Sequence, residues 1–400
     1  ALLGLLIAAV PLAWVGWRQR HAPPAARLRA LTFVIVFLTF DLVVFGSFTR
    51  LTDSGLGCPD WPGCYGSASP LGARDEIHAA QTALPTGPVT HGKAWIEMIH
   101  RYLATAVGFL IIVLTVGAWM VARRSADRSV ANGVSAAAWP LSPWWATASL
   151  VWVIAQGAFG ALTVTMKLYP AIVTLHLLGG VGLLALLAIQ AQVLEPRPLP
   201  MTTGGRRLLG AVAAAVVLQI ALGGWVSTNY AVLACTDFPT CQGQWWPPMD
   251  VAEGFSILRP LGESAVGGYL PFEALTAIHM AHRLGAVLLF SLVLALIVML
   301  WRQNSGHARG MALVWGLMMV WQFVSGLSNV VLGWPLVAAV AHSAGAAAMV
   351  MLTAVHMTRV WQAPKHPHPA ASLPTDAARA GHARSERFPA ASAAAGPRAG

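Results

Sequence analysis

The stretch GSFTRLTDSGLGCPDWPGC, residues 46–64, recurs later in the chain as GGWVSTNYAVLACTDFPTC, residues 223–241. The two stretches align without a gap. The matching positions are Cys58 with Cys235, Asp60 with Asp237, Pro62 with Pro239 and Cys64 with Cys241. Self-similarity at a fixed separation is the sequence signature of a repeat architecture. We therefore interpret the chain as a tandem repeat.

The composition on both sides of these stretches is that of a membrane protein. Hydrophobic residues make up 56% of the 400 residues and charged residues only 10%, whereas soluble domains carry about 25% charged residues. The net charge of +10 does not indicate a nucleic-acid partner, because the basic residues lie mainly in short loops between apolar runs, as the positive-inside rule requires.

Apolar runs near the length of about 20 residues that crosses a bilayer predict eight membrane-spanning helices. They lie near residues 30–49, 96–121, 143–164, 171–193, 208–228, 273–301, 311–331 and 335–358. We predict an all-α polytopic membrane protein built as two four-helix transmembrane bundles in parallel repeat. A shorter apolar run, Leu2–Trp17, is either a ninth span or an uncleaved signal-like segment.

The predicted spans divide the chain into five parts. They are an N-terminal apolar segment with a basic loop (1–29), a first bundle (30–195), a linker (196–207), a second bundle (208–361) and a tail (362–400). The basic residues that mark the cytoplasmic side are Arg18, Arg20, Arg27, Arg29, Arg123, Arg124, Arg128, Arg197, Arg206, Arg207, Arg302 and Arg309. We expect a multi-pass protein of the bacterial inner membrane, with the cysteine loops in the periplasm and a disordered cytoplasmic tail.

Four histidines recur at corresponding positions of the two halves. The segments IEMIHRYL (96–103) and IHMAHRLG (278–285) each contain a His-Arg pair, and later helices add His176 and His342. The predicted topology places all four at a similar depth below the periplasmic surface. A single histidine inside a membrane is more often a packing residue, but matched pairs in both halves favour ligands. Each half thus offers two imidazoles.

Two imidazoles that face each other across a four-helix bundle can ligate haem iron from both sides. Zinc or copper would need further Cys, His or carboxylate ligands, and the predicted helices offer few. We expect His100 with His176, and His282 with His342, to hold haem. Arg101 and Arg283 follow two of these histidines and are candidates for binding haem propionates, or else interfacial anchors.

The halves differ three residues before the His-Arg pair. Glu97 stands in the first half, where the second half has His279. A carboxylate near a haem edge can relay protons or stabilise positive charge as a substrate carbon is oxidised. Glu97 is therefore the candidate catalytic residue, and the alternative is a stabilising hydrogen bond or an ion pair with Arg101.

The four cysteines lie in the two extracytoplasmic loops as Cys-x5-Cys pairs. An oxidising compartment and an even count favour two local disulfides, Cys58–Cys64 and Cys235–Cys241. Each disulfide is either a clip that shapes a lid over a haem or a redox relay.

The motifs RLTDSGLGCPDWPGC, EMIHR, LHLLGG, AHR and AHSAG, in this order on eight helices, resemble the haem A synthase family. The likeness covers about residues 30–358. It implies oxidation of the C8 methyl group of haem O to a formyl group by successive hydroxylations, giving haem A for cytochrome oxidase. It further implies a haem b cofactor in the second half and substrate haem beside Glu97 in the first.

The resemblance leaves several points open. Two histidine ligands on one iron leave no site for dioxygen, so a ligand must leave or the oxidant must arise elsewhere. The implied partners are haem O, lipids, a haem O synthase, an electron donor and a second copy of the chain. The rival interpretations are a di-haem membrane cytochrome b that only transfers electrons, and a haem transporter or chaperone.

Overall fold

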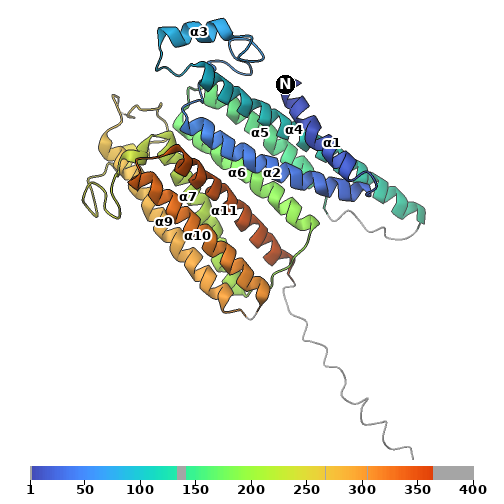
Figure 1. The fold of residues 1–400 in the computed structure, drawn as a ribbon. Coiled ribbons are helices and arrows are strands. Elements are labelled where there is room, and N and C mark those ends of the chain that lie inside the picture. The colour runs from blue at the N-terminus through green and yellow to red at the C-terminus, as the bar shows by residue number, and fades with distance from the viewer. Residues whose placement is uncertain (1, 133–140, 266, 304, 364–400) are drawn as a thin grey trace, which may run out of the picture. The chain divides into compact units, whose positions relative to one another are not determined.

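A computed structural model of the chain describes residues 2–132, 141–265, 267–303 and 305–363, with the backbone alone over 125–132. The tail from residue 364 and the side chain of Arg128 lie outside these described residues. The helices are α1 (Leu2–Arg18), α2 (Pro24–Leu51), α3 (Arg74–Ala83), α4 (His91–Asn132), α5 (Trp144–Thr165), α6 (Pro170–Leu194), α7 (Thr203–Thr228), η1 (Ala231–Leu233), α8 (Val251–Gly254), α9 (Phe272–Trp301), α10 (Gly306–Val331) and α11 (Leu336–Gln362). Figure 1 shows the long helices running side by side. The all-α class is confirmed.

Eight helices within the described residues are long and apolar enough to cross a membrane. They are α2, α4, α5, α6, α7, α9, α10 and α11, and each contains one of the eight predicted spans. The polytopic prediction is therefore confirmed. The long connection after α2 contains the short helix α3, and the long connection after α7 contains the short helices η1 and α8.

Four helices, α2, α4, α7 and α10, begin five or six residues earlier than predicted, and the first two of these starts change the position of charged residues. Helix α2 starts at Pro24, so Arg27 and Arg29 belong to its first turns and not to a loop. Proline suits the first helical position because its fixed φ is helical and its missing N–H would have no partner there. Helix α4 starts at His91. Glu97 and His100 consequently lie about two turns inside α4 and not at its beginning.

The helices of the first half form a four-cornered bundle. Helices α2 and α4, α4 and α5, α5 and α6, and α6 and α2 pack against each other, whereas the described parts of α4 and α6 do not approach closely. Helix α4 therefore lies diagonally opposite α6. A buried core that includes Ile35, Leu110 and Leu187 fills the part of this bundle that lies away from the disulfide loop.

The second half has the same arrangement. Helices α7, α9, α10 and α11 pack in sequence around a second core with Trp315 at its centre, and α9 lies diagonally opposite α11. The halves meet where α6 packs against α7 and α11, and where α2 packs against α11. The matching order and packing support the internal repeat, which stays a prediction.

Helix α1 adds to the first half. It packs against α4 and α2, and Ala8 is fully buried in the first core. Gly4 permits the close approach, because a Cβ at this position would lie 2.6 Å from the Cβ of Thr105. The segment is therefore a helix docked on the bundle, and its crossing of the membrane stays a prediction.

Candidate functional site

Four helices carry the repeated histidines. His100 lies on α4, His176 on α6, His282 on α9 and His342 on α11. Each histidine is roughly two to three turns from the N-terminal end of its helix. Since consecutive spanning helices alternate in direction, these four helices begin at the same membrane face. The structure therefore places the histidines in one layer, near the face that also carries the two disulfide loops.

The histidines of each half are brought together across their bundle. The rings of His100 and His176 lie close enough for charges on them to interact, and so do the rings of His282 and His342. Each pair comes from diagonally opposite helices, α4 with α6 and α9 with α11. All four side chains are half-buried. This arrangement is compatible with the predicted pairing, which stays a prediction.

A glycine of the preceding helix faces each histidine ring. A Cβ would lie 2.9 Å from the Cε1 of His100 if added at Gly46, and 3.4 Å from the Cε1 of His176 if added at Gly160. The corresponding distances are 3.0 Å from Gly223 to His282 and 3.0 Å from Gly326 to His342. These contacts are tight for a Cβ, so each ring lies against bare backbone. Glycine sets the position of the imidazoles.

Glu97 and its counterpart His279 each hold the loop above them. Glu97 is 4% exposed, pairs with Arg101 and accepts a hydrogen bond of 2.8 Å from the backbone N–H of Cys58. His279 is also 4% exposed, and its Nδ1 lies 3.0 Å from the carbonyl oxygen of Ala231. The ion pair with Arg101, the alternative role for Glu97, is present. The catalytic role of Glu97 stays a prediction, because one carboxylate can both anchor a loop and exchange a proton.

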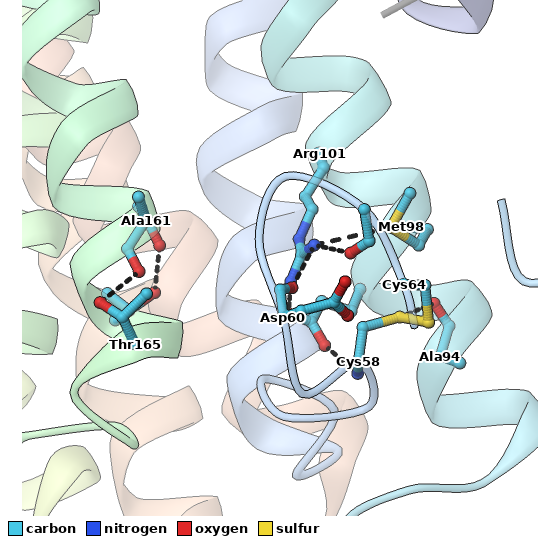
Figure 2. A network of polar contacts seen from close by, with 12 residues as sticks. Cys58, Asp60, Cys64, Ala94, Met98, Arg101, Ala161 and Thr165 are labelled. Carbon is cyan, nitrogen blue, oxygen red and sulfur yellow. Dashed lines mark hydrogen bonds and ion pairs between the residues drawn. A yellow bond between two sulfur atoms is a disulfide. The ribbon is translucent and has the colours of Figure 1, made fainter. Parts of the chain in front are cut away.

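Arg101 and Arg283 bind the disulfide loops. Arg101 donates to the carbonyl oxygens of Asp60 at 3.0 Å and Gly63 at 2.6 Å, as Figure 2 shows for the labelled Arg101 and Asp60. Arg283 donates to the carbonyl oxygens of Asp237 and Thr240, each at 2.8 Å. The two arginines therefore act as clamps on equivalent backbone positions, and propionate binding by either stays a prediction.

Both predicted disulfides are present, Cys58–Cys64 and Cys235–Cys241. Figure 2 shows the first of them beside Ala94 and Met98 of α4. The sequence did not indicate how the hairpins are closed. The carboxylate of Asp60 accepts from the N–H groups of residues 65 and 66, and that of Asp237 accepts from residues 242 and 243. The matching aspartates in the two aligned stretches were the available signal.

Two of the histidines have polar partners on another helix. Gln219 donates to the carbonyl oxygen of His282 at 3.0 Å, and Ser325, which the sequence did not indicate, lies 3.1 Å from the Nδ1 of His342. A glutamine four residues before each of Gly160, Gly223 and Gly326 indicates an amide that bonds across helices. The side-chain nitrogen of Gln219 does so, while the side-chain oxygens of all three glutamines, Gln156, Gln219 and Gln322, have no hydrogen-bond partner among the described residues.

Comparison with known proteins identifies the family. Residues 29–355 match the family model described as cytochrome oxidase assembly protein. A heme A synthase from Shewanella oneidensis is 38% identical over 329 residues, which cover 81% of this chain and 93% of that protein. The chain belongs to the haem A synthase family. Further heme A synthases, from Halalkalibacterium halodurans and Granulibacter bethesdensis, are each 27% identical and cover 74% and 86% of the chain, and 85% and 90% of their own length.

The haem A synthase match covers both bundles. All four histidines, Glu97 and both disulfide loops lie inside the matched range of residues 29–355, while the whole of α1 and the whole tail lie outside it. The candidate site is thus within the part of the chain that the family shares.

Proposed function

We propose that this chain is a membrane enzyme that oxidises haem O to haem A for cytochrome oxidase, converting the C8 methyl group to a formyl group by successive hydroxylations. The observation that carries the proposal is the pairing of His100 with His176 and of His282 with His342 on diagonal helices of two bundles. Membership of the haem A synthase family supports it.

The residues present fit haem. Each pair offers two imidazoles from diagonally opposite helices, with each ring packed against glycine backbone, and two such imidazoles can ligate haem iron from both sides. Zinc fits less well, because the described residues contain no group of three or more His, Cys, Asp or Glu side chains that could hold a metal ion. His100, His176, His282 and His342 would therefore be the iron ligands.

The two halves have different roles in this proposal. His282 and His342 hold the haem b cofactor, and His100 and His176 receive the substrate haem. The difference between Glu97 and His279 supports this division, since only the first half has a buried acid beside its histidines. A bound haem supplies one-electron redox chemistry that no side chain offers.

Glu97 is the group that can move a proton at the substrate haem. Its Oε2 already accepts the N–H of Cys58, and its Oε1 faces Arg101. These contacts fix the carboxylate about two turns inside α4, three residues before His100. We propose that Glu97 takes up protons as the methyl group is oxidised, while Arg101 keeps the loop closed over the haem and excludes water.

The surroundings of the reaction follow from the same assignment. We propose that the enzyme lies in the bacterial inner membrane with its disulfide loops in the periplasm and its tail in the cytoplasm. Haem O synthase would deliver the substrate, a separate donor would supply electrons, and a second copy of the chain is a further expected partner.

The test replaces Glu97→Gln and extracts the haems for mass analysis. We expect haem A to fall by roughly 10²- to 10⁴-fold, the usual contribution of a general acid or base, while haem O accumulates and both haem absorbances persist. The matched control is His279→Gln, which places an amide at the equivalent anchoring position of the second half and should leave haem A production in place.

Other outcomes would contradict the proposal. Normal haem A in the Glu97→Gln variant would reject the catalytic assignment. Wild-type protein that contains haem b alone, with no haem O, haem A or hydroxylated intermediate, would favour an electron-transferring cytochrome.

A further inference from the structure

The four histidines differ in what their Nδ1 atoms contact. The Nδ1 of His342 lies 3.1 Å from the hydroxyl of Ser325, and the Nδ1 of His282 lies 3.1 Å from the amide of Gln219. The Nδ1 atoms of His100 and His176 are buried and have no hydrogen-bond partner among the described residues. Both partners thus belong to the second half.

The donor and acceptor can be assigned at Ser325. Its hydroxyl has one proton, and the carbonyl oxygen of Trp321, one turn earlier on α10, lies 2.7 Å away. This is the shorter of its contacts, so the proton goes to Trp321 and the Ser325 oxygen faces His342 as an acceptor. The Nδ1 of His342 must then carry the ring proton. In a neutral imidazole this leaves the Nε2 lone pair free.

Metal-bound histidines commonly donate their other N–H to an acceptor oxygen, which fixes the tautomer and the ring orientation and makes the ligating nitrogen a stronger donor.

The first half lacks this arrangement. In the predicted repeat Gly160 corresponds to Gly326, so the residue at the place of Ser325 is Phe159. Phenylalanine has no hydrogen-bonding group. The residue at the place of Gln219, four positions before Gly46, is Leu42. Both positions that supply an Nδ1 partner in the second half are apolar in the first.

We propose that Ser325 is a positioning residue that holds His342 as the Nδ1–H tautomer, so that its Nε2 is presented to haem iron and the second half retains its haem firmly. The first half, with Phe159 at the place of Ser325, has no such lock and can exchange the haem that it receives. This inference rests on the proposed function, since it requires the histidine pairs to ligate haem.

The test compares Ser325→Ala, Ser325→Thr and Ser328→Ala in the full-length protein, purified from cells in which haem b is the only haem. Ser328 is a matched control, because its hydroxyl donates to the carbonyl oxygen of Val324 in the same way but through an exposed hydrogen bond. Two quantities are measured, the rate at which haem passes to apomyoglobin and the reduction potential of the retained haem.

We expect Ser325→Ala to lose haem about 10- to 100-fold faster, the usual effect of removing such an outer hydrogen bond. Its reduction potential should rise, because a weaker donor ligand stabilises ferric iron less. Ser325→Thr keeps the hydroxyl and should restore both values. Ser328→Ala should match the wild type.

Equal haem loss and equal potential in the two alanine variants would overturn the role of Ser325 while leaving the haem assignment intact. Protein that binds no haem in any form, or that keeps its spectrum after His342→Ala, would instead reject the proposed function. Thermal unfolding of each apoprotein, measured by circular dichroism, separates loss of the ligand from loss of the fold.

Discussion

Glycine is the residue on which the position of each histidine depends. The four rings lie against Gly46, Gly160, Gly223 and Gly326, where an added Cβ would come within 2.9–3.4 Å of a ring carbon. Interiors are packed closely enough that one extra methyl group is felt. The distance between the histidines of a pair therefore depends on these positions as much as on the histidines themselves.

We predict that Gly326→Val lowers haem content and destabilises the protein. The new side chain would push the His342 ring, and overpacking of this kind typically costs about 1–3 kcal/mol. Gly316 on the same helix is the matched control, since no atom lies within 4 Å of a Cβ placed there. Haem absorbance per chain and thermal unfolding measure both effects. Equal losses in the two variants would show that the contact with His342 does not matter.

The sequence indicated candidate residues but few of their contacts. Equal spacing in the two halves indicated the four histidines, since that depends on position alone. The partner Ser325 came only from the structure, because a hydroxyl within a membrane helix can bond its own backbone as readily as a neighbour. The ion pair of Glu97 with Arg101 was the alternative that the sequence offered to a catalytic role, since residues four apart on a helix are neighbours.

The disulfide hairpins are the elements that the two halves share in most detail. In each hairpin an aspartate accepts hydrogen bonds from two backbone N–H groups. An arginine of the next membrane-spanning helix, α4 or α9, donates to two carbonyl oxygens of the hairpin. The pKa of Asp237 is held below its usual value, first by the hydroxyl of Thr240 and then by the N–H groups of Gly243 and Gln242. The ionised carboxylate therefore stabilises the hairpin.

The sign of the pH effect follows from the lowered pKa. The stabilisation is complete above the unfolded-state value of about 3.9 and is lost as the pH falls through the lower folded-state value. We predict that Asp237→Asn speeds the reduction of Cys235–Cys241 by a phosphine at neutral pH, and that acid does the same in the wild type. Cys58–Cys64 should be unaffected by Asp237→Asn. Equal acceleration of both disulfides would contradict a local role.

Helix number could be predicted more accurately than helix ends. Eight long apolar runs give eight spans, because the bilayer sets the required length. The starts of α2 and α4 were missed by several residues. Hydropathy marks only the apolar run, and both helices extend beyond that run into charged and polar residues. The docking of α1 on α4 was also beyond the sequence.

At the scale of the whole molecule, the halves touch through corresponding residues. Arg50 donates to the carbonyl oxygen of Ser227 at 2.6 Å, and Tyr230 donates to Asp53 at 2.7 Å. Both pairs are separated by 177 residues, which is also the separation of Cys58 from Cys235. Contacts between equivalent positions are expected beside a two-fold axis along the membrane normal. They support the repeat and could not be predicted, because two repeats can pack through many faces.

The central claim is that each bundle holds one haem between its own pair of histidines. Its most direct test is the haem content per chain of two double variants, His100→Ala with His176→Ala, and His282→Ala with His342→Ala. We predict that each variant loses one haem and retains the other, and that the remaining haem has a different absorbance spectrum in the two variants. Full absorbance in both variants, or wild-type protein that stays colourless when haem is supplied, would contradict it.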